Sequence, residues 1–216
     1  LEVTRTKGTS GSHWKQAKLI DTLLSKHGTA ITPVPHEKVP IRGIRLDSTT
    51  CPTTPAQKLE WKSKPFRSHL GIIGYLMLNT RNDCCFAYSQ LARWNENCGQ
   101  AHWDALIKLC AYLKKTRDTQ YVVLSKHGGW ALCGYCDSDY NGTDTCQSTT
   151  GWVIFFGCSP VSWVSRLQRA TSRSTAEAEY MALSSISQEA VYLSMFAESL
   201  RVPRSVFELY CNDRAT

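Results

Sequence analysis

The chain has 216 residues, of which 42% are hydrophobic and 20% are charged, a composition ordinary for a globular protein with one sizeable core or two small ones. It contains no apolar run near the roughly 18 residues of a membrane span and no basic-then-apolar secretion signal, so neither a membrane anchor nor a secreted disulfide scaffold is expected. The net charge of +7 is uneven: residues 1–118 hold 18 Lys and Arg against 9 Asp and Glu, and residues 119–216 hold 7 against 9. This asymmetry suits a phosphate-binding surface beside a cation-binding centre, although a solvated basic face is the simpler alternative.

The first half of the chain predicts a strand followed mainly by helices. Residues 1–6 resemble the end of a strand, and an amphipathic helix is predicted from about Trp14 to His27, ended by Gly28. Residues 29–64 hold five prolines and are expected to form a long, extended and mobile connection. Further helices are expected over residues 65–78, 83–93 and 102–115.

From Gln120 the hydrophobic period changes to two, which predicts strands. They are expected over residues 121–124, 130–136, 151–157 and 161–165, with the last two joined as a hairpin through Pro160. A long helix follows from about Ser174 to Leu200, with Ser174 and Glu177 forming a capping box at its start. The last strand is expected over residues 206–211.

The ten cysteines are interpreted mainly as small buried hydrophobic side chains. The five that lie in apolar stretches are Cys84, Cys85, Cys110, Cys133 and Cys158. A zinc site at Cys133 and Cys136 is the less favoured interpretation, because the next cysteines, Cys146 and Cys158, follow at irregular spacing.

Acidic residues stand at the ends of the strands and at the start of the long helix. Asp137 ends a strand, where a turn aspartate is an equally good explanation, and Asp139 is the weaker candidate because a turn follows it. Glu177 and Glu179 lie two residues apart and point about 200° from each other on a helix, so only one can be a ligand. Glu179 is favoured, because it lies near the buried face, where a carboxylate needs a partner and a metal would provide one. With Asp213 at the end of the last strand, the set is typical of a site for hard divalent cations.

The order of these blocks resembles the RNase H region of copia-type retrotransposon Pol polyproteins. The strand with the family's first aspartate is similar to GYCDSDYNG, the following hairpin to STTGWVIFFGCSPVSWVSRLQ, and the helix with the glutamate to STAEAEYMALS. The segments that join reverse transcriptase to RNase H are similar to FRSHLGIIGYLMLNTRNDCCFAYSQLAR and AHWDALIKLCAYLKKTRDTQ. The end of the polymerase palm and the thumb are similar to the opening LEVT and the helix after it.

The resemblance implies an α/β (α+β) fold, an RNase H-like mixed sheet in β-β-β-α-β order preceded by a small helical thumb and connection region. It divides the chain into the end of reverse transcriptase (1–50), a helical connection (51–118) and an RNase H-like domain (119–216). It also implies hydrolysis of the RNA strand of RNA–DNA hybrids with Mg²⁺ or Mn²⁺, held by Asp137, Glu179 and Asp213. The expected partners are the hybrid and the remainder of the Pol polyprotein, inside the cell in virus-like particles or the nucleus.

Basic side chains on or after the helix over residues 102–115 are candidate nucleic-acid contacts, or ordinary solvated charges at a helix C-terminus. They are Lys108, Lys114, Lys115 and Arg117. No polymerase active site is expected in the chain. Two departures from the family favour a second interpretation, a catalytically decayed remnant that still binds nucleic acid: Asn212-Asp213 replaces aspartate-asparagine, and the sequence stops at Thr216, before the fourth carboxylate.

Overall fold

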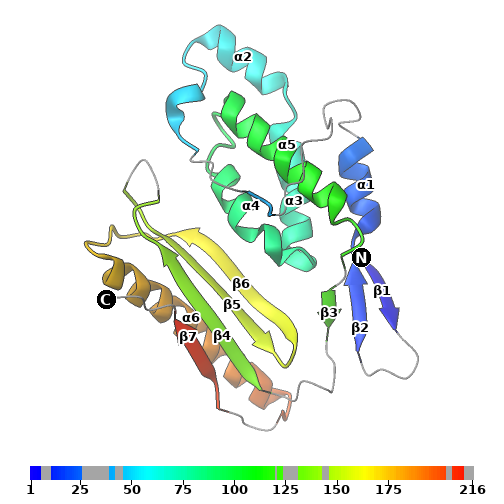
Figure 1. The fold of residues 1–216 in the computed structure, drawn as a ribbon, viewed down its shortest axis with the longest axis vertical. Helices are drawn as coiled ribbons and strands as arrows, with labels where there is room; N and C mark the ends of the chain where they lie inside the picture. The colour runs from blue at the N-terminus through cyan, green and yellow to red at the C-terminus, as the bar shows by residue number, and fades with distance from the viewer. Residues whose placement is uncertain are drawn as a thin grey trace. The chain divides into compact units, whose positions relative to one another are not determined.

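The computed structural model describes residues 1–5, 11–25, 39–41, 46–119, 121–123, 131–142, 146–202 and 206–211. The chain forms two compact units (Figure 1). The helical unit comprises Leu1–Glu2 and Lys15–Gln120, and the sheet unit comprises Val3–Trp14 and Tyr121–Thr216. The three-part division implied by the resemblance stays a prediction.

The helical unit contains the helices that the hydrophobic pattern predicts, with their ends moved by a few residues. Its α-helices are α1 (Ala17–Ser25), α2 (Pro55–Ser63), α3 (Phe66–Asn79), α4 (Cys85–Ala92) and α5 (Gln100–Lys115), with short 3₁₀ helices η1 (Ser48–Thr50) and η2 (Asn82–Cys84). Helix α1 begins later than predicted because Trp14 belongs to a strand. Within the described residues, none of the helices combines the length and apolar character that crossing a bilayer requires.

Helix α2 corrects the prediction of an extended connection over residues 29–64. The Thr54 hydroxyl accepts a hydrogen bond from the Gln57 amide at 3.3 Å, and the Gln57 side chain accepts one from the Thr54 amide at 3.2 Å. Pro55 occupies the first turn, where a helix has no use for the missing N–H. Pro55 therefore starts a helix in a segment whose prolines predict an extended chain.

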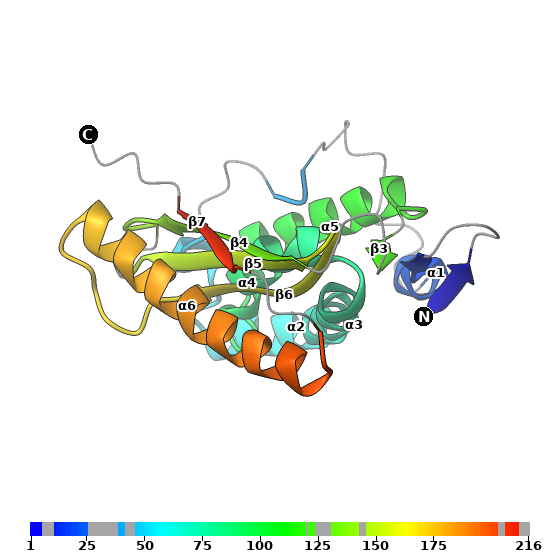
Figure 2. The ribbon, with the colours of Figure 1, turned by 90° about the horizontal axis from the view of Figure 1, so that it is seen from below.

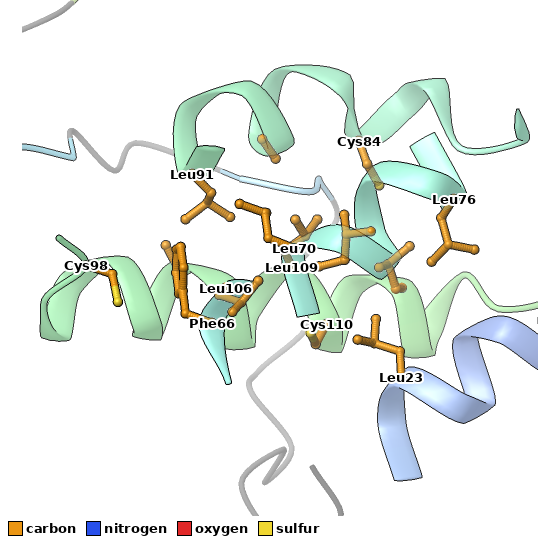
Figure 3. Packing of buried hydrophobic residues seen from close by; sticks show 14 of the residues in the cluster. Leu23, Phe66, Leu70, Leu76, Cys84, Leu91, Cys98, Leu106, Leu109 and Cys110 are labelled. Atoms are coloured by element: carbon orange, nitrogen blue, oxygen red, sulfur yellow. The ribbon is translucent and has the colours of Figure 1, made fainter. Parts of the chain in front are cut away.

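The core of the helical unit is formed by apolar side chains from α1, α3, α4 and α5 (Figure 3). Its fully buried members include Leu23, Leu76, Leu91, Leu106 and Leu109. Cys84 and Cys110 lie inside this core, as predicted. Cys85 and Cys133 are half-buried, and the prediction for Cys158 is wrong, because it lies exposed in the turn between two strands.

The buried side chain of Arg81 ties the end of α3 to the end of α5. Its guanidinium donates to the Asp83 carboxylate at 2.7 Å and to the hydroxyl and carbonyl oxygens of Thr116 at 2.6 and 3.2 Å. The hydroxyl of Tyr112 donates to the same carboxylate at 2.8 Å. Burial opposes the Arg81 charge, but the Asp83 carboxylate more than compensates, so the pKa of Arg81 is raised.

The sheet unit holds a four-stranded mixed sheet in the order β6-β5-β4-β7. Its elements are β4 (Leu132–Asp139), β5 (Thr149–Phe156), β6 (Ser159–Leu167), α6 (Thr175–Ser199) and β7 (Glu208–Cys211). Neighbouring strands are antiparallel except β4 and β7, which are parallel. The predicted RNase H-like fold, with its β-β-β-α-β order, is confirmed.

Two local predictions about strands need correction. A second sheet, ordered β1-β2-β3, consists of β1 (Glu2–Arg5), β2 (Ser12–Lys15) and β3 (Tyr121–Val123), and β2 occupies the predicted start of the first helix. Pro160 lies within β6, opposite Phe155 and next to an irregularity in the register, rather than in the turn. A proline is accepted there because a bulge interrupts the hydrogen-bond ladder.

Helix α6 packs along one face of the four-stranded sheet (Figure 2). The residues that join it there are Leu132, Cys136, Trp152, Ile154, Ala182 and Ile186. Gly134 lets α6 approach closely, because a Cβ atom at this position would lie 2.8 Å from Cδ1 of Ile186 and 2.9 Å from Cδ2 of Leu209. The helix can thereby pack close to β4, one of the two inner strands of the sheet.

Candidate active site

Asp137 and Glu179 meet at the backbone amide of Ser138. The Ser138 N–H lies 2.8 Å from Oδ1 of Asp137 and 3.1 Å from Oε1 of Glu179. The Ser138 hydroxyl donates to the same Glu179 oxygen at 2.7 Å. Because both carboxylates contact one nitrogen, β4 and α6 bring two of the three predicted site residues side by side.

Glu179 is a buried carboxylate, only 9% exposed, with hydrogen-bond donors at both of its oxygens. Ser138 serves Oε1, and the thiol of Cys211, at the end of β7, lies 3.4 Å from Oε2. Buried charge is tolerated where polar partners replace water. The sequence predicts a metal as the partner of the Glu179 carboxylate. Among the described residues, Ser138 and Cys211 supply hydrogen-bond partners for it.

Asp137 is the exposed member of the pair. Its neighbours Cys136 and Ser138 point toward α6, as the alternation of side chains along a strand requires. The Asp137 side chain itself starts from the other face of β4, and its carboxylate turns toward the Ser138 amide, the nitrogen that Glu179 also contacts.

Asp139 and Glu177 make local contacts in a turn and at a helix start. The carboxylate of Asp139 lies over Gly142, so closely that a Cβ atom there would collide with it. The Ser174 hydroxyl accepts from the Glu177 amide at 3.1 Å, as predicted, but the Glu177 carboxylate accepts from the amide of Arg173, at 2.6 Å, rather than from that of Ser174. The expected capping box is thus displaced by one residue. Asp213 lies outside the described residues.

The start of α6 is fastened to the sheet by polar side chains that the sequence analysis missed. The Gln168 amide donates to the Thr150 hydroxyl at 3.1 Å and to the Ala178 carbonyl at 2.9 Å. The hydroxyls of Ser148 and Ser172 are hydrogen-bonded at 2.8 Å. Ala178 directly precedes Glu179, so the bonds of Gln168 fix this turn of α6 to β5. Thr150 lies in β5, whereas Ser148, Gln168 and Ser172 lie just outside the strands, where polar residues are common and give no sequence signal.

Cys136 and Cys211 face each other across β4 and β7, next to Glu179. Burial raises the pKa of both thiols, that of Cys211 to about 12. Both thiols are therefore weak hydrogen-bond donors at neutral pH. In the sequence Cys136 directly precedes Asp137 and Cys211 stands two residues before Asp213, which is the signal that relates these thiols to the site.

The described residues contain no group of three His, Cys, Asp or Glu side chains close enough to hold a metal ion. Cys133 and Cys136 are three residues apart on β4, so their side chains point to opposite faces of the sheet and cannot share a zinc ion.

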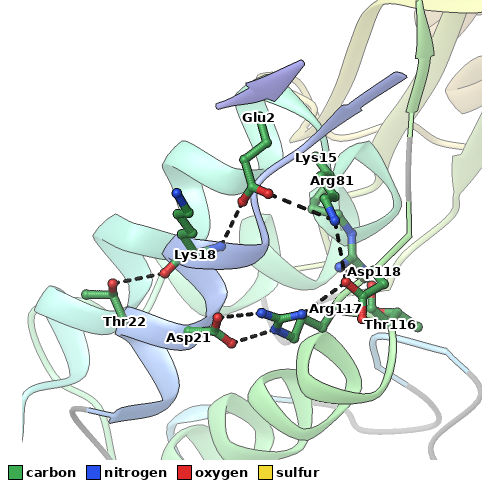
Figure 4. A network of polar contacts seen from close by, with 9 residues as sticks. All are labelled: Glu2, Lys15, Lys18, Asp21, Thr22, Arg81, Thr116, Arg117 and Asp118. Atoms are coloured by element: carbon green, nitrogen blue, oxygen red, sulfur yellow. Dashed lines mark hydrogen bonds and ion pairs between the residues drawn. The ribbon is translucent and has the colours of Figure 1, made fainter. Parts of the chain in front are cut away.

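The basic candidates on or after α5 differ in how free their charges are, and Figure 4 shows the contacts of one of them, Arg117. Lys114 and Lys115 are exposed at the end of the helix and Lys108 is half-buried. Arg117 forms two hydrogen bonds of 2.6 Å with the Asp21 carboxylate, and a third of 3.0 Å with Asp118. The Arg117 guanidinium lowers the pKa of Asp21, and the Asp21 carboxylate in turn raises that of Arg117. The charge of Arg117 is thus largely neutralised by Asp21 and Asp118 within the helical unit.

Comparison with known proteins finds the Pol polyproteins of plant transposons. The chain is 31% identical, over its whole length, to the retrovirus-related Pol polyprotein from transposon TNT 1-94 of Nicotiana tabacum, of which it spans 16%. It is 28% identical over 208 residues to that from transposon RE1 of Arabidopsis thaliana, a match to 94% of the chain and 13% of the polyprotein. It is also 37% identical over 135 residues to the secreted RxLR effector protein 161 of Plasmopara viticola, a match to 62% of the chain and 94% of the effector.

No family model and no solved structure matches the chain. The two polyproteins, however, align with nearly all of it, through both the helical unit and the sheet unit. The chain belongs to the copia-type retrotransposon Pol polyproteins, as a fragment of such a polyprotein.

Proposed function

We propose that the sheet unit hydrolyses the RNA strand of RNA–DNA hybrids, as an RNase H does, with Asp137, Glu179 and Asp213 holding Mg²⁺ or Mn²⁺. The observation that carries the proposal is the meeting of Asp137 and Glu179 at the Ser138 amide. The order of the elements around this point and the membership in the Pol family support it.

The donor set fits a hard divalent cation. Asp137 and Glu179 supply carboxylate oxygens, the ligands that Mg²⁺ prefers, from two separate elements. In a site of this type, bound cations activate the attacking water and stabilise the leaving oxygen of the phosphodiester. Asp137 is open to solvent, whereas Glu179 is fixed, so the two residues would offer a cation one accessible and one prepositioned carboxylate.

The two carboxylate oxygens of Glu179 differ in the strength of their hydrogen-bond donors. Oε1 is held by the amide and hydroxyl of Ser138, which we regard as a positioning residue. Oε2 faces the Cys211 thiol at 3.4 Å, and a thiol is a weak donor. Oε2 is therefore the oxygen that is more easily given up to a cation.

A second candidate function is a nucleic-acid-binding remnant with the same fold and no turnover. It is favoured by the contacts of Glu179, both of whose oxygens already have protein donors. The excess of basic residues over 1–118 would still attract a nucleic-acid backbone, and binding would weaken steeply with salt. In either case the partners would be the hybrid and the rest of the Pol polyprotein, in virus-like particles or the nucleus.

The test is cleavage of a labelled RNA–DNA hybrid by the full chain with Mg²⁺ or Mn²⁺, and with EDTA as the metal-free control. Asp137→Asn is expected to abolish cleavage and to leave hybrid binding in EDTA unchanged. Asp139→Asn is the matched control, because it removes a carboxylate two residues away, at the end of β4, that lies over Gly142. It should keep cleavage.

Unchanged cleavage by Asp137→Asn would overturn the proposed site. Hybrid binding that is sensitive to salt, with no cleavage by the parent chain under either metal, would establish the remnant instead.

A further inference from the structure

Cys136 and Cys211 lie opposite each other in the parallel pairing of β4 with β7. Their side chains point to the same face of the sheet, since Cys136 belongs to the core beneath α6 and Cys211 packs against that core. The two side chains are in hydrogen-bonding contact, and both are free thiols. The fold thus brings together two cysteines that lie far apart in the sequence.

The spacing of the two strands suits a disulfide bond. Neighbouring strands lie about 4.8 Å apart, and disulfides join residues whose Cα atoms are roughly 4.4–6.8 Å apart. Because the thiols already contact each other, the bond requires no change in the pairing of β4 with β7. Cys133 on the same strand differs, because it lies opposite Glu208 and its side chain points to the other face of the sheet.

The thiol of Cys211 is also a hydrogen-bond donor to the buried Glu179, at 3.4 Å from Oε2. A sulfur atom in a disulfide carries no proton, so it has none to donate. The amide and hydroxyl of Ser138 would still hold Oε1. Oxidation of the pair would therefore change the surroundings of one Glu179 oxygen and leave those of the other as they are.

The two cysteines differ in how easily an oxidant reaches them. Cys136 is buried, whereas Cys211 is half-buried on β7, a strand at the edge of the sheet. A small disulfide from solution would therefore meet Cys211 first and leave Cys136 beside it as the second thiol. This is the arrangement of a thiol that is attacked from outside and a neighbouring thiol that resolves the product.

We propose that Cys136 and Cys211 form a reversible disulfide that fastens β7 to β4 and removes the thiol donor from Oε2 of Glu179. The disulfide itself does not depend on the hydrolysis proposed above. Only its effect on metal binding at Glu179 rests on that function. The tests below use neither metal nor hybrid, so the two proposals can fail separately.

The reaction is thiol–disulfide exchange with a low-molecular-weight disulfide. The Cys211 thiolate attacks one sulfur of that disulfide, forms a mixed disulfide and releases one small thiolate. The Cys136 thiolate then attacks Sγ of Cys211, so the bond between the two cysteines forms and the second small thiolate leaves. The protein thiols lose two protons, which the two released thiolates take up. The protein is oxidised by two electrons, and the small disulfide is reduced by two.

The first experiment maps the bond by peptide analysis. The full chain is incubated to equilibrium with excess oxidised glutathione, free thiols are alkylated, and the chain is digested with chymotrypsin, which cleaves after tyrosine. Cys136 is then released in residues 136–140 (CDSDY) and Cys211 in residues 211–216 (CNDRAT), and neither peptide contains a second cysteine. Mass spectrometry should find the two peptides linked, and dithiothreitol should separate them.

Cys133→Ser is the matched control, since it removes a half-buried thiol of the same strand from the opposite face and should keep the link. The same incubation in denaturing urea should lower the yield of linked peptide at least tenfold, because the strand pairing is then lost. Glutathione retained on Cys211 without the link, or an equal yield in urea, would overturn the proposal.

The second experiment measures whether the bond fastens the edge strand. Oxidation should raise the urea midpoint of the sheet unit by about 1–2 M, because the disulfide closes a long loop of the unfolded chain. Cys211→Ala and, independently, Cys136→Ala should remove this rise, and Cys133→Ser should keep it. An equal rise in Cys211→Ala, or a midpoint of the linked chain no higher than that of the reduced chain, would contradict the proposed fastening.

Discussion

Ser138 is the residue on which the geometry of the candidate site depends. It follows Asp137 on β4, its amide contacts both carboxylates, and its hydroxyl holds the buried Glu179. A carboxylate in a mostly apolar setting loses much of its hydration, and charge-assisted hydrogen bonds replace that loss. The serine therefore contributes both to folding and to the position of Glu179.

Ser138→Ala is expected to lower the free energy of unfolding by about 1.5–3 kcal/mol, because it removes a hydrogen bond to a charged group. Urea denaturation measures the change. Ser194→Ala on α6 is the matched control, since its hydroxyl only returns to the Ala190 carbonyl of the same helix, and it should change stability by less than about 0.5 kcal/mol. Equal changes in the free energy of unfolding for Ser138→Ala and Ser194→Ala would contradict a stabilising role of the contact between Ser138 and Glu179.

The resemblance to the family predicts Asp137 and Glu179 as partners, and they do meet. It does not predict that Ser138 and Cys211 hold the glutamate. Those contacts depend on the register between β4 and β7 and on the depth at which α6 packs, neither of which is contained in the local pattern of residues.

At the scale of the elements, the close approach of α6 to β4 depends on a residue without a side chain. The ideal Cβ position on Gly134 falls within 3 Å of the ends of the Ile186 and Leu209 side chains. Ile186 is fully buried in the core of the sheet unit and has little room to move, and Leu209 packs against that core, partly buried, from the edge strand β7.

Gly134→Ala is expected to destabilise the chain by about 1–3 kcal/mol, because the new methyl group forces Ile186 and Leu209 out of their positions. Gly71→Ala is the control. Gly71 lies within α3 with open space around its Cβ position, so alanine there should stabilise the chain by about 0.5–1 kcal/mol. Chemical denaturation compares the two, and a stabilising Gly134→Ala would contradict the close packing.

Long elements with a clear period were predictable, and short ones were not. The long helix and the hairpin before it follow from hydrophobic spacing and from the family resemblance. Helix α2 was missed because its prolines suggested a loop, and β2 because four residues are too few to show a period. Both are held by contacts or caps rather than by an apolar stripe of their own.

At the scale of the whole molecule, buried cysteine thiols in both units keep their protons to a higher pH than an exposed thiol does. Burial raises the pKa of Cys84 and of Cys110 in the helical unit, the latter to about 12, and that of Cys136 and Cys211 in the sheet unit. A group whose pKa is higher in the folded chain than in the unfolded chain stabilises the folded chain at pH values below the ordinary pKa of the group. That stability is lost as the pH rises through the folded value, because the unfolded chain then releases protons that the folded chain retains.

The free energy of unfolding should therefore fall between pH 9 and pH 12. Cys110, fully buried, contributes at most about 4 kcal/mol of this loss, as its pKa is raised from 9.0 to about 12. Cys110→Ala should lower stability at pH 8 but flatten its decline above pH 9, by up to about 1.4 kcal/mol per pH unit. Urea denaturation under reducing conditions tests this. Cys158→Ala, at an exposed position, should leave the decline unchanged, and an unchanged decline in Cys110→Ala would contradict the assignment.

The parallel pairing of β4 with β7 has a consequence for biosynthesis. A ribosome makes β4, β5, β6 and α6 before it reaches β7. The edge of β4 that pairs with β7 therefore stays open during synthesis of the residues between the two strands. An open strand edge is a template for pairing with other chains. Copies of the polyprotein growing on the same messenger would be exposed to mispairing at this edge until Glu208–Cys211 emerges to cover it.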